Sequence, residues 1–164
     1  MKTKEDLFKF LQSLNIEVKT FEHKAVFTAE EAEKECGHLP GGHVKNLFLK
    51  DNKKQLWLIV AISSTVIQLK ALSKKLNTSG LRFASEDTLT SVLGVTRGSV
   101  TPFALINDEQ HQVKVVLDKK LFVYDVLNFH PLTNEATTTI SADDFKKFLD
   151  ACGNAVMIVD FESI

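Results

Sequence analysis

Residues 56–62 limit the possible folds more than any other segment, because they read LWLIVAI without one polar side chain. Such a short run cannot cross a bilayer as a helix. A strand with one wet face alternates apolar and polar residues, whereas a continuous apolar run is typical of a strand buried on both faces. The run therefore predicts a strand inside a sheet that is covered on both sides.

The segment before that run, residues 41–51, reads GGHVKNLFLKD and carries a lysine inside an extended apolar stretch. In a strand over 43–49 the side chains alternate between faces, so Lys45 shares a face with Leu47 and Leu49. A charged amine away from water is unfavourable unless it is paired or borders a cavity. The alternative is an ordinary lysine at the wet end of the strand, whose flexible stem reaches solvent.

Composition and organisation indicate one domain over residues 1–164. The chain has 44% hydrophobic and 25% charged residues, which are values of a globular protein with a sizeable core. No linker, internal repeat or low-complexity tract divides it. No apolar run typical of a signal peptide follows the first residues, and Cys36 and Cys152 lack CxxC spacing. We therefore expect a cytoplasmic protein with free thiols.

Helices and strands are mixed without a regular βαβ order, which favours the α+β class. Helical spacing predicts a helix over 4–14, and capping signatures at Thr28, Thr65 and Ser141 predict helices to about residues 36, 76 and 152. A further helix is expected over 85–93. Strands are predicted at 16–22, 43–49, 55–62, 81–84, 103–106, 113–117, 121–124, 136–140 and 155–161. The expected core is a mixed, mostly antiparallel sheet or barrel-like sheet flanked by helices.

Charge is distributed unevenly, although the formal net charge is only −1. That balance does not indicate bulk binding to nucleic acid. Residues 52–85, however, contain no acidic side chain and six basic ones. Ordinary solvated lysines explain such a window well, and the window also allows a local contact with a polyanion.

The familiar catalytic motifs are missing: the chain has no GxSxG, HExxH, P-loop or GxGxxG sequence. The five histidines are scattered, and His38 and His43 have no evident third ligand nearby, so no metal site and no cofactor are predicted. Cys36 near His38 has no residue to orient the pair, which favours a buried structural cysteine.

Two further stretches are informative. Residues 94–102 read GVTRGSVTP, and their two glycines allow the backbone to approach a ligand closely. Backbone amides from Gly98 to Thr101 can then be presented to a carbonyl or oxyanion; a plain loop is the alternative. Residues 128–139 read NFHPLTNEATTT and are dense in short hydrogen-bonding side chains, as is also usual at a strand edge.

Three segments together resemble the YbaK/prolyl-tRNA synthetase-associated domain family, and most closely its freestanding PrdX or ProXp-ala branch. They are VKNLFLKD at 44–51, GSVTPFALIND at 98–108 and NFHPLTNEATTTI at 128–140. The similarity covers essentially the whole chain. Arg97 departs from the pattern, because proline is expected before the glycine-serine pair.

The resemblance implies trans-editing, which is hydrolysis of the ester in tRNA for proline mischarged with alanine. A synthetase pocket cannot strongly reject a smaller side chain, so a second site clears the error. Lys45 is then the essential residue and holds the phosphate or ribose of the terminal adenosine. A ribose hydroxyl helps to activate water, and backbone amides at Gly98 and Ser99 hold the ester carbonyl.

The same resemblance implies the remaining site residues and the partners. Asn46 and His130 shape the substrate pocket, together with Thr101 and Asn134. The basic residues expected to contact the acceptor stem are Lys50, Arg82, Lys70 and Lys74. The partner is the acceptor end of tRNA, with prolyl-tRNA synthetase as a possible second partner.

Two other functions remain open from the sequence. Cysteinyl-tRNA deacylation, as in the YbaK branch, keeps the fold and changes the amino acid that is cleared. A non-catalytic module that binds tRNA or the synthetase would hold charged tRNA without turnover.

Overall fold

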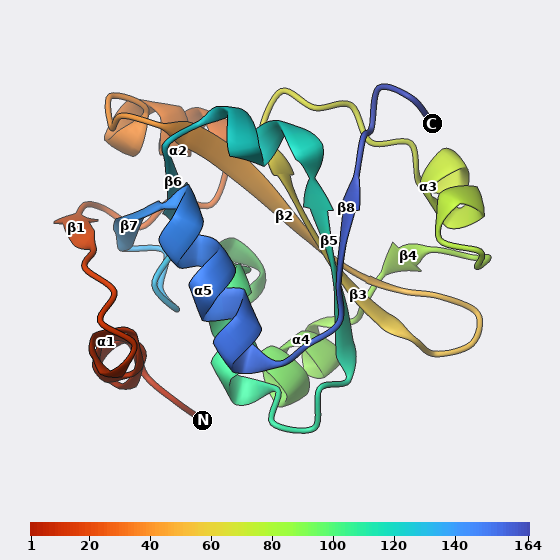
Figure 1. The fold of residues 1–164 in the computed structure, drawn as a ribbon, viewed down its shortest axis with the longest axis horizontal. Coiled ribbons are helices and arrows are strands. Elements are labelled where there is room, and N and C mark those ends of the chain that lie inside the picture. The colour runs from red at the N-terminus through yellow and green to blue at the C-terminus, as the bar shows by residue number, and fades with distance from the viewer.

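The computed structural model describes residues 1–164 and shows a mixed sheet with helices on both faces (Figure 1). The α-helices are α1 Lys4–Ser13, α2 Ala29–Cys36, α3 Leu69–Lys75, α4 Glu86–Leu93 and α5 Ala142–Cys152. The strands are β1 Lys19–Glu22, β2 Gly42–Lys50, β3 Leu56–Ile62, β4 Arg82–Phe83, β5 Val113–Asp118, β6 Val126–Phe129, β7 Ala136–Ser141 and β8 Val156–Val159. Three 3₁₀ helices complete the fold: η1 Arg97–Ser99, η2 Pro102–Asn107 and η3 Lys119–Val123.

One sheet contains all eight strands in the order β1-β7-β6-β2-β3-β5-β8, with β4 paired to β2 beside this path. The pairs β1/β7, β6/β7, β2/β3 and β2/β4 are antiparallel, whereas β2/β6, β3/β5 and β5/β8 are parallel. Four of the seven pairings are thus antiparallel. The predicted α+β class with a mixed, mostly antiparallel sheet is confirmed.

Strand β3 lies inside the sheet, and all seven of its residues are buried. Leu58 and Val60 belong to a core of 26 residues on one face, which α1, α4 and α5 cover. Trp57 and Ile59 belong to a core of nine residues on the other face, where α3 contributes Leu72. Burial on both faces, predicted from the unbroken apolar run, is confirmed.

Most helix limits follow from capping side chains. The hydroxyls of Thr28 and Ser141 accept hydrogen bonds from the backbone N–H groups of Glu31 and Asp144, as predicted. The third predicted cap, at Thr65, is wrong. Helix α3 begins at Leu69 without a side-chain cap, because the Thr65 hydroxyl donates to the buried carboxylate of Asp118 instead, at 2.5 Å.

Two predicted strands are also wrong. Residues 103–106 lie in η2, where Pro102 has no N–H to donate to a sheet and the Thr101 hydroxyl accepts from the Phe103 N–H. Residues 121–124 fall on η3 and its C-terminal end, because the Asp118 carboxylate accepts from the Lys120 N–H and starts a helical turn. Strand β6 was not predicted. No helix is long and apolar enough to cross a membrane.

Glycines allow β2 to run close beside β6. Gly41 has φ +92°, and a Cβ there would lie 2.4 Å from the Val126 carbonyl oxygen. Gly42 then pairs with Leu127 in the parallel β2/β6 ladder. This close approach places the start of β2, with Lys45 and Asn46, next to the segment that follows β6.

Candidate functional site

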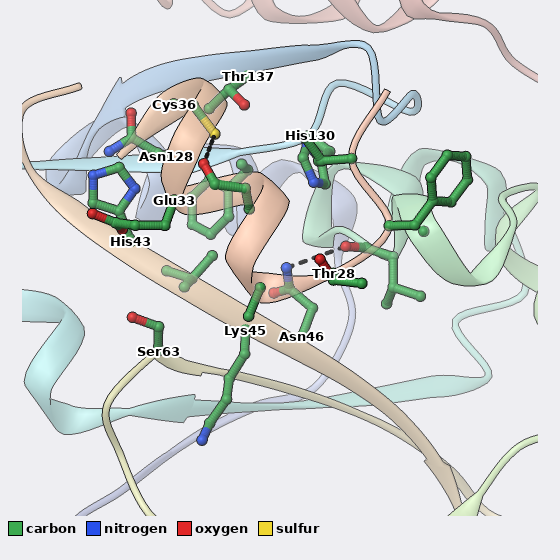
Figure 2. A pocket seen from close by; sticks show the side chains of 18 of the residues that line it. Thr28, Glu33, Cys36, His43, Lys45, Asn46, Ser63, Asn128, His130 and Thr137 are labelled. Carbon is green, nitrogen blue, oxygen red and sulfur yellow. Dashed lines mark hydrogen bonds between the residues drawn. The ribbon is translucent and has the colours of Figure 1, made fainter. Parts of the chain in front are cut away.

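A cavity of about 490 Å³ lies between α2, the start of β2, the η1 segment and the end of β6. Figure 2 shows its lining, with α2 on one side and Asn46 and His130 projecting from the other elements. This volume lies in the range of small-molecule sites. Lys45, Asn46, Gly98 and His130 all line it, so the structure brings together residues from all three segments singled out in the sequence.

Lys45 borders this cavity, yet its ammonium group does not point into it. Nζ donates a hydrogen bond to the backbone carbonyl of Thr65, in the turn after β3. Figure 2 shows the side chain directed away from Asn46 and His130, as expected for neighbours on alternate faces of a strand. Lys45 is half-buried, so it sits at the rim between the cavity and solvent.

Asn46 ties β2 to the η1 segment. Its Nδ2 donates to the Val100 carbonyl at 3.1 Å, and this contact fixes the orientation of the amide because a carbonyl only accepts. Its Oδ1 is buried and has no hydrogen-bond partner. A buried acceptor without a hydrogen-bond partner costs free energy of folding. Such a group beside a cavity is typical of a binding site, where a ligand can supply the missing donor.

The His130 ring is neutral, and its Nε2 can accept a hydrogen bond. Its Nδ1 lies 3.0 Å from the Ala136 carbonyl, so this nitrogen carries the proton. Burial lowers the pKa of His130, and His23 nearby lowers it further, whereas the Ala136 contact acts in the opposite direction. The net pKa lies below its ordinary value, so at neutral pH Nε2 is left with a free lone pair.

Gly98 allows the η1 segment to form the cavity wall. A Cβ at this position would lie 3.0 Å from Nδ2 of Asn134 and 3.4 Å from the Phe27 ring. Asn134 donates to the Val26 carbonyl at 2.9 Å, so this side chain holds the segment that faces Gly98. Arg97, at the position where proline was expected, is exposed and also lines the cavity.

Three predicted site residues do not line the cavity. Ser99 is buried and its N–H donates to the Thr96 carbonyl at 2.9 Å, so this amide is already used within the η1 turn. Thr101 is fully buried and starts η2. The Asn134 side chain donates to the carbonyl of Val26, and it is Val26 that lines the cavity. In this structure these residues support the wall, whereas direct contact with a ligand was the prediction.

The predicted acceptor-stem residues divide into two groups. Lys50 pairs with Arg82 in the β2/β4 ladder, and Arg82 is oriented by the Gly80 carbonyl and by Asn52 Oδ1, at 3.0 and 3.2 Å. Lys70 and Lys74 are exposed and lie one turn apart on α3. Lys50 lies five residues beyond Lys45, which corresponds to about 17 Å along a strand.

Sequence reasoning missed the wall formed by α2. Glu33 and Cys36 come from that helix, and Asn128 and Thr137 come from β6 and β7. Burial raises the pKa of the Cys36 thiol, which disfavours a reactive thiolate. No signal other than the Thr28 cap pointed to α2, because only the fold brings this helix over β2. No group of three or more metal-binding side chains occurs.

Comparison with known proteins gives the family. Residues 23–148 match the model of the aminoacyl-tRNA editing domain, so the chain belongs to that family. It is 39% identical over 161 residues to the "Prolyl-tRNA editing protein ProX" of Acetoanaerobium sticklandii, with 98% of each chain covered. It is also 39% identical over 164 residues to the "Prolyl-tRNA synthetase associated domain-containing protein 1" of Xenopus laevis, with 97% of each covered. The family inferred from the three segments is confirmed.

Solved structures agree in fold. The "putative trans-editing enzyme for prolyl tRNA synthetase" superposes with a TM-score of 0.72 at 20% identity, covering 98% of this chain and 97% of that one. A second structure, of a hypothetical protein, gives 0.73 at 18% identity and covers 93% and 97%. At such low identity the likeness establishes the fold alone.

Proposed function

We propose that this protein is a trans-editing deacylase that hydrolyses the ester of tRNA for proline mischarged with alanine. Family membership and two full-length relatives with prolyl-tRNA names support the substrate class. The single observation that supports the proposal is that Asn46, Gly98 and His130 line one cavity and that Lys45 borders it at the rim. The tRNA acceptor end is the proposed partner, and docking on prolyl-tRNA synthetase stays a prediction.

We favour substrate-assisted hydrolysis, and the cavity offers no reactive thiol for covalent catalysis. Its only thiol, Cys36, has a pKa raised by burial and donates to the Ala32 carbonyl, so it is a poor nucleophile. In the proposed reaction a ribose hydroxyl of the substrate orients water for attack on the ester carbonyl. The water oxygen bonds to the carbonyl carbon and gives up one proton to solvent, which forms a tetrahedral oxyanion. This oxyanion collapses, the bond to the esterified ribose oxygen breaks, and that oxygen takes up the second water proton, so that alanine leaves as its carboxylate.

Four of the residues that line the cavity have a proposed part in that reaction. Backbone at Gly98 lies against the ester carbonyl, and the Lys45 ammonium binds the phosphate of the terminal nucleotide. Neutral His130 and the unpaired Oδ1 of Asn46 supply acceptors for the polar hydrogens of the aminoacyl-adenosine. The Gly98 amide replaces the predicted Gly98–Ser99 pair, because the Ser99 amide is occupied.

The basic surface has a proposed part in binding the tRNA body. Lys50 and Arg82, which pair across β2 and β4, form one part of the proposed surface, and Lys70 and Lys74 on α3 form the other. Phosphate contacts of this kind position a nucleic acid without reading its sequence.

Single-turnover deacylation of tRNA for proline charged with alanine, cysteine or proline tests the proposal. Loss of the alanyl ester alone is the expected result. Faster loss of the cysteinyl ester would assign the protein to the neighbouring branch. Binding of all three without any turnover would show a binding module and would contradict the proposed activity.

A further inference from the structure

Lys45 is connected to a buried carboxylate through one residue. Its ammonium donates to the carbonyl of Thr65, and the hydroxyl of the same Thr65 donates to Oδ2 of Asp118 at 2.5 Å. Thr65 is 4% exposed and Asp118 is 1% exposed, so this link is shielded from water. None of the three ion pairs in the structure includes Lys45 or Asp118.

Asp118 fixes the turn that carries this carbonyl. Its Oδ2 also accepts from the Ile62 N–H at 3.1 Å, and its Oδ1 accepts from the Lys120 N–H at 3.0 Å. In the turn over 62–65 the Thr65 N–H donates a hydrogen bond to the Ile62 carbonyl at 2.9 Å. Loss of the Thr65 hydroxyl therefore frees the end of this turn without removing the carbonyl itself.

The arrangement leaves the positive charge of Lys45 available. A direct pair with Asp118 would neutralise the ammonium, whereas a neutral carbonyl holds it in place and is readily replaced by a phosphate oxygen. The strand register explains why Lys45 and Asp118 do not pair directly. Lys45 on β2 pairs with Ala61 on β3, and Asp118 lies on β5, one residue beyond the Val60–Leu117 pair. One intervening strand keeps the carboxylate away from the lysine.

We infer that Thr65 and Asp118 are positioning residues for Lys45. Asp118 fixes the turn over 62–65, and the Thr65 carbonyl of that turn holds the ammonium at the rim of the cavity. This role rests on the proposed function where it concerns catalysis, but the position of Lys45 can be measured without any substrate.

The chain provides a matched control. At the opposite end of β3 the Thr78 hydroxyl donates to the buried carboxylate of Asp51 at 2.6 Å. Thr65→Val and Thr78→Val each remove one hydroxyl that donates to a buried aspartate. Thr65 is buried and Thr78 is half-buried, and only Thr65 contacts Lys45. Thr65→Ser keeps the hydroxyl and is the rescue variant.

The first readout is the reductive methylation rate of each lysine in the folded protein, measured by mass spectrometry. In Thr65→Val we expect the rate at Lys45 to rise about three-fold or more, since weakening one hydrogen bond of about 1 kcal/mol allows such a change. Thr65→Ser and Thr78→Val should leave it unchanged. An unchanged rate in a folded Thr65→Val protein would overturn the inference.

If Thr65→Val does not fold, the methylation rates of the lysines in the wild-type protein still test the inference. Lys45 should then react several-fold more slowly than Lys50 on the same strand, and equal rates would overturn the inference.

The second readout is single-turnover deacylation in a double-mutant cycle with Lys45→Ala. Thr65→Val should be about ten-fold slower, the effect expected for one hydrogen bond to a charged group. Adding it to Lys45→Ala should cause no further loss, because it acts through Lys45. Additive losses would show a general structural role. If Thr65→Val changes the methylation rate of Lys45 but Lys45→Ala stays fully active, the proposed catalytic role of Lys45 is rejected. The positioning role of Thr65 is then kept.

Discussion

Each end of β3 has a buried aspartate that accepts a hydrogen bond from a threonine hydroxyl, but the two aspartates stabilise turns with different roles. Asp51 at one end and Asp118 at the other are both buried carboxylates that accept a threonine hydroxyl. Asp51 also accepts from the indole of Trp57 at 3.0 Å and from two backbone N–H groups, and it completes the turn between β2 and β3. Asp118 completes the turn whose carbonyl holds Lys45. The two carboxylates therefore differ in what their turns present: the Asp51 turn only joins two strands, whereas the Asp118 turn presents a carbonyl to Lys45.

The largest expected effect concerns stability at the Asp51 end. Asp51→Asn replaces an acceptor of four hydrogen bonds by an amide whose NH₂ faces donors, so we expect the free energy of unfolding to fall by about 2–4 kcal/mol. Urea denaturation followed by the fluorescence of Trp57 measures this loss. A loss below about 1 kcal/mol would mean that this end is not the structural anchor described above.

The same carboxylate should make stability depend on pH in acid. Burial raises the pKa of Asp51, but hydrogen bonds from Thr78, Trp57 and two backbone groups outweigh it, and the net pKa is lowered. The folded state therefore gains stability above the ordinary pKa of about 3.9 and loses it as the pH falls through the lower folded value. Urea midpoints between about pH 5 and pH 3 should fall less in Asp51→Asn than in the wild type. An equal fall in both would contradict this assignment.

At the pocket end, the pH dependence should appear in activity. Burial lowers the pKa of His130, and we propose that the neutral ring is the active form. The deacylation rate should therefore fall in acid with a midpoint below about 6.5, the ordinary histidine value. His130→Gln, which keeps a hydrogen-bonding side chain, should be about ten-fold slower and should lack this midpoint. An acid limb that persists in the variant would assign the titration to another group.

The smallest expected effect concerns tRNA binding near the Asp51 end. Arg82 is exposed, so Arg82→Ala should weaken binding modestly and reduce the slope of log affinity against log salt by about one. Titration of labelled tRNA for proline at several salt concentrations measures this slope. Lys114→Ala provides the control, since Lys114 lies over the Trp57 ring, away from the cavity lining. An unchanged slope in Arg82→Ala would remove this residue from the proposed surface.

The sequence predicted those parts of the fold that depend on local patterns. The unbroken run of β3 and the caps at Thr28 and Ser141 are such patterns, and all three are confirmed. Thr65 carries the same local signature as a cap, but a carboxylate 53 residues away competes for its hydroxyl. Residues 103–106 have a strand-like composition, but Pro102 and the Thr101 hydroxyl favour a 3₁₀ helix.

The site was only partly predictable for the same reason. Motifs identified Lys45, Asn46, Gly98 and His130, all of which line the cavity. They did not reveal that the Ser99 amide is occupied within its own turn. The contribution of α2, and the connection from Lys45 through Thr65 to Asp118, arise from contacts between distant segments, which no local pattern encodes.

The most direct test of the account is single-turnover deacylation of alanyl-tRNA for proline by Lys45→Ala beside Lys114→Ala. Both variants remove one lysine from a strand of the same sheet, and only Lys45 borders the cavity. We expect Lys45→Ala to be slower by about a hundred-fold or more, as is typical when a charge that stabilises the reacting complex is lost. Lys114→Ala should match the wild type. Equal activity of Lys45→Ala and wild type would contradict the central claim that the pocket end of β2 carries the chemistry.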